Sequence, residues 1–275
     1  MAGCAPRCRE EEFSSENSSA SAPRRVLPEM MALDAIAAAS VIELLSYSPP
    51  GWGANLVRGL INSLIIAFGA FGLGLGIGTL GAFGKLYGGP VTRDLLGVYT
   101  TVVRAVPELV LILILYFGIT DAVNRLLVEF GYDRIQLSGL AAGIAVLGVV
   151  QGAYATEVLR GAILAVPGGQ IEAARAMGMA PVMLARRITL PAMLSFAIPG
   201  LANLWLIATK DTALLAVVGF AELTQETRQA AGTTKAYFTF FVAAGVLYLA
   251  VSLLSTVVFG RIERRARRGQ PEAVQ

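Results

Sequence analysis

Residues 60–83 read LINSLIIAFGAFGLGLGIGTLGAF and contain no charged side chain. About 20 consecutive apolar residues are enough for an α-helix to cross the hydrocarbon core of a bilayer. This stretch therefore predicts a transmembrane helix, and the chain is expected to be an integral membrane protein.

Four further segments have a similar length and apolar character: 95–119, 137–156, 193–220 and 238–259. Only Arg104 and Glu108 interrupt the first of them, and only Lys210 and Asp211 interrupt the third. Overall, 15% of the residues are charged, against about 25% in soluble domains. We therefore expect an all-α membrane protein with about five spans.

The ends of the chain differ in composition from its middle. Residues 1–30 are polar, with an acidic run and a Ser-rich stretch, and are expected to be a disordered tail, which a misassigned start codon would explain. Residues 55–260 are expected to form the transmembrane domain, and 261–275 a basic cytoplasmic tail.

Several classes of site are disfavoured by what the sequence lacks. It has no histidine, and its two cysteines, Cys4 and Cys8, have no further ligand nearby for a metal site. Gly84-Lys85 is not a phosphate-binding loop, because such a loop requires Gly at position 79 and Ser or Thr at position 86, where Thr79 and Leu86 stand. We expect no catalytic residues, no metal site and no cofactor in this chain.

Glycines recur through the first span, at positions 69, 72, 74, 76 and 78. Small residues at such spacing let two helix backbones approach closely in a lipid environment. The pattern predicts tight packing of this helix against another span.

Basic residues in the connecting loops indicate the orientation. One side of the membrane would hold eleven and the other five, with the N-terminal tail left out. The larger set is Lys85, Arg93, Arg160, Arg175, Arg186, Arg187, Arg261, Arg264, Arg265, Arg267 and Arg268; the smaller is Arg58, Arg125, Arg134, Arg228 and Lys235. This asymmetry predicts a cytoplasmic C-terminus, with the first span starting outside.

The loop between the third and fourth spans, 157–191, is long enough to have structure of its own. Residues 170–177 favour a helix, with Glu172 expected in its first turn; Gly178 suits the helix end, and Pro181 suits the start of a second helix. Leu190-Pro191 would end that second helix. We expect two short cytoplasmic helices joined by a glycine hinge.

The same loop resembles the signature of binding-protein-dependent ABC importer permeases, the EAA loop. The matching positions are Glu172, Ala173, Ala174, Gly178, Ile188, Leu190 and Pro191. Three further stretches, RAVPELV at 104–110, NLWLIATKDTAL at 203–214 and ELTQETR at 222–228, resemble the polar amino acid branch. That branch includes the Q-type permeases of histidine, lysine/arginine/ornithine, octopine and nopaline systems. The sequence differs from it at 104–107, where RAVP replaces the frequent RGTP.

The resemblance implies the type I ABC importer permease fold and a place in the bacterial inner membrane. It also implies four partners: ATPase subunits that bind ATP and Mg, a second permease subunit or a second copy, a periplasmic solute-binding protein, and an amino acid substrate. Nucleic acid is not among them. The seven loop residues would form the coupling element that docks on the ATPase.

Charges inside predicted spans are costly, so they should face protein or water. Arg104 and Glu108 are four residues apart and could pair on one helix, whereas Lys210 and Asp211 point in different directions. One interpretation is structural pairing between helices. The other is a polar path for solute, formed by Arg104, Glu108, Asn203, Trp205, Lys210, Asp211 and Thr212.

Two other functions compete with an importer permease. A secondary transporter or channel would need no ATPase, but it would have no reason to carry the coupling signature. A membrane enzyme is disfavoured, because no nucleophile and base occur together in a recognisable pattern.

Overall fold

The computed structural model describes residues 41–133 and 139–267, so the predicted tail at 1–30 lies outside the described residues. The chain divides into two compact units, Met1–Leu45 and Ser46–Gln275. In the first unit, residues 41–44 are helical. Everything below concerns the second unit.

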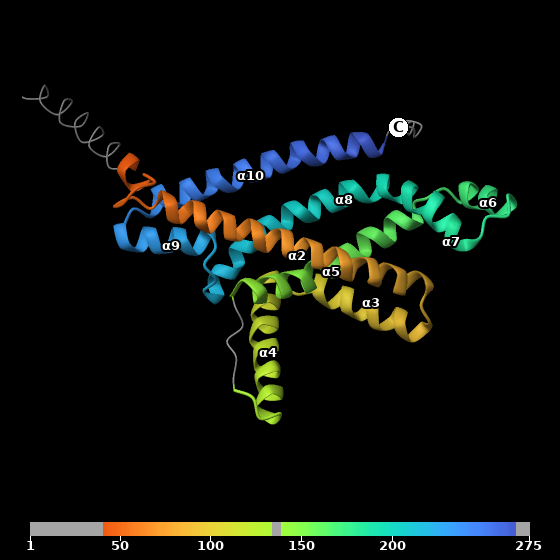
Figure 1. The fold of residues 1–275 in the computed structure, drawn as a ribbon, viewed down its shortest axis with the longest axis horizontal. Coiled ribbons are helices and arrows are strands. Elements are labelled where there is room, and N and C mark those ends of the chain that lie inside the picture. Colours follow the sequence, from red (N-terminus) through yellow and green to blue (C-terminus); the bar gives the residue numbers. More distant parts are fainter. Residues whose placement is uncertain (1–40, 134–138, 268–275) are drawn as a thin grey trace, which may run out of the picture. The chain divides into compact units, whose positions relative to one another are not determined.

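The described part of the second unit is helical throughout and contains no strand (Figure 1). Its helices are α2 (Gly53–Tyr87), α3 (Pro90–Ala105), α4 (Glu108–Glu129), α5 (Gly139–Leu164), α6 (Gly168–Ala176), α7 (Pro181–Leu184), the π-helix η1 (Ala185–Thr189), α8 (Leu190–Asp211), the 3₁₀-helix η2 (Thr212–Val218), α9 (Leu223–Thr234) and α10 (Tyr237–Ala266).

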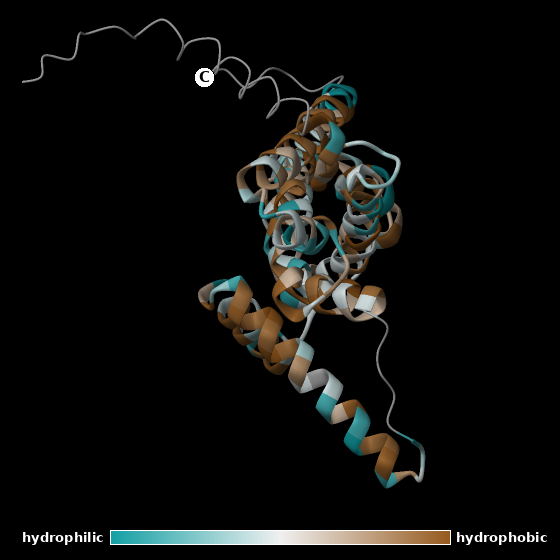
Figure 2. Ribbon diagram, turned by 90° about the vertical axis from the view of Figure 1, so that its left-hand side faces the viewer, coloured by the Kyte–Doolittle hydropathy of each residue, from teal (hydrophilic) through white to brown (hydrophobic). Residues whose placement is uncertain are grey.

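Five helical segments of the described chain are long and apolar enough to cross a membrane, which confirms the predicted number. They are Gly53–Tyr87, Glu108–Glu129, Gly139–Leu164, Pro181–Val218 and Tyr237–Ala266. Figure 2 shows hydrophobic residues over the outward faces of these helices, as contact with lipid or with another membrane protein requires.

The predicted second span, 95–119, is wrong in its bounds. α3 ends at Ala105, Val106 is extended with φ −90° and ψ 139°, and α4 begins at Glu108. Pro107 explains the break, because proline disfavours the helical conformation in the residue before it. α3 has 16 residues and is only about 24 Å long, so α4 is the spanning helix.

α2 and α5 form the centre of the fold and run parallel. Gly69 contacts Ile144, Gly74 contacts Gln151 and Gly78 contacts Ala155, in the same order along both helices. A Cβ on Gly74 would lie 2.8 Å from the Cβ of Gln151, so a larger residue does not fit. The predicted role of these glycines in helix packing is confirmed, while Gly72 and Gly76 face open space.

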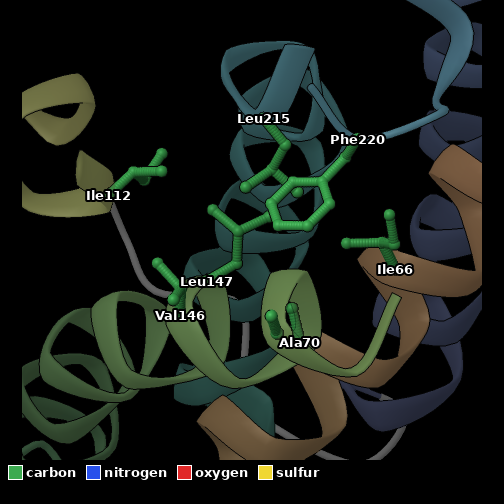
Figure 3. Close-up of a cluster of buried hydrophobic side chains, with 8 residues drawn as sticks. Ile66, Ala70, Ile112, Val146, Leu147, Leu215 and Phe220 are labelled. Atoms are coloured by element: carbon green, nitrogen blue, oxygen red, sulfur yellow. The ribbon is translucent and has the colours of Figure 1, made fainter. Parts of the chain in front are cut away.

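Around this pair, α8 packs on α5, and α10 packs on α8 and α9 (Figure 1). A buried apolar cluster joins α2, α4, α5 and η2 (Figure 3). Leu147, Leu215 and Phe220 lie at its centre, with Ile66 of α2 on one side and Ile112 of α4 on the other. This cluster holds the first turns of α4 against the packed helices, from which the rest of α4 projects (Figures 1 and 2).

The packed helices therefore have two distinct ends. The loop with α6 and α7 lies beyond the C-terminus of α5, and α2 ends on the same side because it runs parallel to α5. We call this the loop end. α9 packs on the N-terminal part of α2, where Gly59 contacts Leu223, and marks the opposite end.

Candidate functional site

Three charged side chains lie at the termini of three helices. Arg104 is in the last turn of α3, Glu108 is in the first turn of α4, and Lys210 is in the last turn of α8. Each charge has the sign that the dipole of its helix end favours. The breaks at Val106-Pro107 and at Thr212 thus place these charges at helix termini rather than within helices.

Hydrogen bonds connect these charges to α5. The Tyr154 hydroxyl donates to Glu108 Oε1 over 3.3 Å. The Gln151 Nε2 amide donates to Asp211 Oδ2, also over 3.3 Å. The guanidinium of Arg104 lies over the Tyr154 ring, 6.0 Å from its centroid. We call Arg104, Glu108, Gln151, Tyr154, Lys210 and Asp211 the central polar cluster.

The two carboxylates of the cluster are near enough to interact electrostatically. Glu108 and Lys210 both act on Asp211, with opposite signs. Neither carboxylate belongs to an ion pair within 4.0 Å in the described part of the chain. The predicted possibility of an Arg104–Glu108 pair on one helix is therefore wrong: the two residues lie on different helices, separated by the Pro107 break.

Two polar side chains of the central polar cluster are buried, so each of their polar atoms needs a hydrogen-bond partner. Asp211 is 8% exposed and Gln151 only 1%. The Gln151 Oε1 atom is buried without a hydrogen-bond donor among the described residues. An unpaired buried acceptor costs about 1–3 kcal/mol. The cluster thus contains three acceptor groups, from Glu108, Gln151 and Asp211.

The depth of the cluster follows from the α2–α5 register. Gln151 packs on Gly74, which lies near the middle of the uncharged run 60–83. Gln151 and its partner Asp211 therefore lie far from both ends of α2 and α5, whereas Glu108 lies at the start of α4. Polar groups at such a depth usually mark the path of a solute or a proton.

The remaining residues of the predicted path lie elsewhere. Trp205 is buried against Phe68, Phe71 and Phe259, and its Nε1 donates to Ser255 Oγ over 2.9 Å. Thr212 is buried and donates to the Thr209 carbonyl. Both residues therefore make their contacts within the packed helices.

Asn203 and Lys210 are exposed and lie seven residues apart on α8, which places them on one face of that helix. An amide and an ammonium group exposed on a spanning helix require protein or water beside them. This face is consistent with the predicted path, which stays a prediction for both residues.

Gln151 and Tyr154 were missed by sequence reasoning, because they are uncharged residues within an apolar span. The only feature of the sequence that could have indicated a polar site here is an amide and a phenol three residues apart in an apolar run. Their role depends on contacts with α4 and α8 that no local pattern reveals.

The loop end carries the second candidate site. α6 ends at Ala176, and Gly178 has φ +74°, a left-handed conformation that favours glycine. Its N–H donates to the Arg175 carbonyl over 2.9 Å, and α7 then begins at Pro181. The two helices and the glycine hinge are confirmed.

Two details of the predicted loop are wrong. α6 starts at Gly168, so Glu172 lies beyond its first turn. Leu190-Pro191 does not end a helix: the chain passes from α7 through η1 into α8, and Pro191 lies in the first turn of α8. Proline lacks an N–H and clashes with the carbonyl four residues earlier, and a π turn before it accommodates both effects.

The loop also exposes apolar side chains. Met177 is 80% exposed and Val182 79%, whereas Ala174 is buried. Glu172 and Ala173 are exposed as well, and Ile188 is half-buried. Met177 lies outside the five apolar segments and Val182 at the very start of Pro181–Val218, and an exposed apolar patch at such a place marks a protein contact. Met177 and Val182 were not identified from the sequence.

Comparisons with known proteins identify relatives of the chain. A model of the family described as "Binding-protein-dependent transport system inner membrane component" matches residues 72–268. The octopine transport system permease protein OccQ of Rhizobium radiobacter is 37% identical, covering 84% of this chain and 98% of its own length. The nopaline transport system permease protein NocQ of Agrobacterium fabrum is 41% identical, covering 83% of this chain and 98% of its own.

A third relative is the histidine/lysine/arginine/ornithine transport system permease protein HisQ of Salmonella typhimurium, 38% identical over 81% of this chain and 98% of its own. Among solved structures, an amino acid ABC transporter crystallised with histidines matches with a TM-score of 0.67 and 29% identity, over 78% of this chain and 95% of that one. The MetNI methionine ABC transporter shares the fold, with a TM-score of 0.62 and 24% identity, over 80% of this chain and all of that one. The chain belongs to the family of binding-protein-dependent transport system inner membrane components.

Proposed function

We propose that the chain is the membrane-spanning permease subunit of an ATP-driven importer that takes up cationic amino acids or opines. The relatives named for octopine, nopaline and histidine/lysine/arginine/ornithine transport support the substrate class. The observation that carries the proposal for this chain is the pair of neighbouring carboxylates Glu108 and Asp211, which form no ion pair with a cation among the described residues.

The chemistry of the central polar cluster suits a cationic solute. A guanidinium or ammonium group donates several hydrogen bonds and accepts none. The carboxylates of Glu108 and Asp211, and the Gln151 Oε1 atom that has no donor among the described residues, offer acceptors to such a group. Arg104 and Lys210, at the edges of the cluster, suit the carboxylate of an amino acid.

The partners follow from membership of the family. Two ATPase subunits, which bind ATP and Mg, dock on the loop end through Glu172, Ala173, Gly178, Ile188, Leu190 and Pro191, with Met177 and Val182 added as exposed apolar contacts. Ala174 is buried and supports this surface from behind. A second permease subunit completes the path, and a periplasmic binding protein delivers the solute at the opposite end. The chain itself hydrolyses no ATP, and its loop end faces the cytoplasm of a bacterium.

The substrate class is tested by uptake measurements with the complete transporter. Glu108→Gln keeps the size of the side chain and its ability to accept from Tyr154, but it removes the charge. We expect uptake of labelled arginine to fall at least tenfold, and uptake of a neutral amino acid to change much less. Transport must require ATP, which separates this function from that of a secondary transporter or channel.

The matched control is Glu226→Gln, which removes a carboxylate in α9 at the opposite end. Its arginine uptake should remain normal. Equal losses for cationic and neutral solutes in Glu108→Gln would give Glu108 a structural role. Arginine uptake driven by an ion gradient without ATP would overturn the importer itself.

A further inference from the structure

A cationic cavity lies at the loop end, apart from both candidate sites. Its volume is about 720 Å³, and it opens between the end of α2, the first turns of α3 and the end of α5. Lys85, Arg93 and Arg160 line it, one from each of these helices, together with Asp94 and Val98.

The charges around the cavity do not balance. Glu157 is shared by two cations: its Oε1 lies 2.5 Å from Lys85 Nζ and its Oε2 lies 3.0 Å from Arg160 Nη2. Lys85 also donates to Thr100 over 2.6 Å, which fixes its position. Arg93 belongs to no ion pair within the described ranges. Three cations against Glu157 and Asp94 leave one positive charge.

The cavity lies at the depth of the lipid headgroups. Lys85 is two residues beyond the uncharged run 60–83, and Arg160 is four beyond the uncharged run 137–156. Because α2 and α5 run parallel, both positions lie at the same membrane surface. The ligand that meets this cavity first is therefore a membrane lipid.

An apolar stripe leads from the cavity along α3. Val91, Leu95, Val98 and Val102 are spaced by four, three and four residues, so they lie on one helix face. All four are at least half exposed, from 50% to 79%. Val98 belongs to both the cavity lining and the stripe. A cationic cavity continued by an apolar stripe matches a charged headgroup with its acyl chains.

We propose that this cavity binds an anionic phospholipid of the membrane leaflet at the loop end. One phosphodiester would neutralise the single excess positive charge, and an acyl chain would lie along the stripe. A free phosphate ion would use the cations but gain nothing from Val98 and its neighbours. Basic pockets between spanning helices on the cytoplasmic side are suited to anionic headgroups.

Lipid retention by the purified full-length chain in neutral detergent tests this proposal. Native mass spectrometry would count bound phosphatidylglycerol and, separately, phosphatidylcholine. Arg93→Gln should lower retained phosphatidylglycerol about fivefold, the effect of one basic residue near an anionic surface. Arg93→Lys should retain it, because the charge remains. Phosphatidylcholine should bind weakly in every variant.

The matched control is Arg265→Gln, which removes a charge at the same end, in the last turn of α10. It should retain phosphatidylglycerol like the unaltered chain. Equal loss in the two Gln variants, or no loss in Arg93→Gln, would overturn the proposal, as would displacement of the lipid by excess inorganic phosphate. The measurement involves no solute, so its outcome is independent of the proposed transport function.

Discussion

Glu222 is a carboxylate with no exposed surface, just before α9 at the opposite end. Its Oε1 accepts from the backbone N–H of Gln225 over 2.8 Å, and its Oε2 accepts from Ser63 Oγ over 3.2 Å and from the Tyr248 hydroxyl over 3.1 Å. These donors belong to α9, α2 and α10. One side chain thus joins three helices. In the sequence, residues 222–228 were noted only for their resemblance to the polar amino acid branch, and this role of Glu222 was not predicted.

Burial raises the pKa of Glu222 above its ordinary value of 4.5, although the hydrogen bonds it accepts oppose the shift. The stability that comes from its protonated form is complete below about pH 4.5 and is lost as the pH rises through the raised pKa. We therefore expect the purified protein to melt at a higher temperature at pH 5 than at pH 8.

The variant Glu222→Gln should reduce this difference, because an amide does not titrate in that range. Melting followed by intrinsic fluorescence in detergent measures both forms. Glu222→Ala should instead destabilise the fold by about 3 kcal/mol or more, because three buried donors lose their acceptor. If the unaltered protein and Glu222→Gln have the same pH dependence, another group causes it.

At the scale of helices, the apolar runs were sufficient to predict five spans, and the glycine pattern was sufficient to predict close packing of the first. The break at Val106-Pro107 was overlooked because the hydrophobic run continues across it, although the proline was visible. The meeting of Gln151 with Asp211 depends on how α5 and α8 pack, and local periodicity does not contain that information. Hence the sequence located the charges but not their partners.

The α2–α5 interface offers a sharp comparison within one helix. Gly74→Val places a branched side chain against Gln151. Its Cβ alone would lie only 2.8 Å from the Cβ of Gln151. Gly76→Val meets open space two residues away. We expect Gly74→Val to lower the yield of folded, detergent-stable protein severalfold, since overpacking costs about 1–3 kcal/mol, and Gly76→Val to leave it nearly unchanged. Equal yields would show that the close approach is not required.

The hinge between α6 and α7 can be tested in the same way. Gly178→Pro cannot adopt φ +74° and lacks the N–H that bonds to Arg175. We expect it to abolish ATP-driven uptake while the amount of membrane-inserted protein stays normal. Gly161→Ala is the control, because this glycine is helical and faces open space. Normal uptake by Gly178→Pro would mean that the hinge does not transmit the ATPase cycle.

For the whole molecule, orientation decides which partner meets which end. Of the sixteen basic residues assigned to the connecting loops and the C-terminal segment, eleven are expected at the loop end, and the proposed lipid cavity and the proposed ATPase contact both lie there. The opposite end carries α9, held by Glu222. The assignment of the loop end to the cytoplasm rests on the charge asymmetry of the loops, and it is independent of the solute.

Chemical labelling of single introduced cysteines measures this orientation directly, once Cys4 and Cys8 have been replaced by serine. Gln229 is exposed on α9, and Met177 is 80% exposed beside α6, so cysteine at either position is accessible to a reagent when the chain is expressed without the ATPase subunits. In intact spheroplasts, a membrane-impermeant maleimide should label Gln229→Cys and not Met177→Cys. After permeabilisation it should label both. Labelling of Met177→Cys alone in intact spheroplasts would reverse the topology: the ATPase contact would then lie outside the cell, where no ATP is available, and the importer mechanism would fail with it.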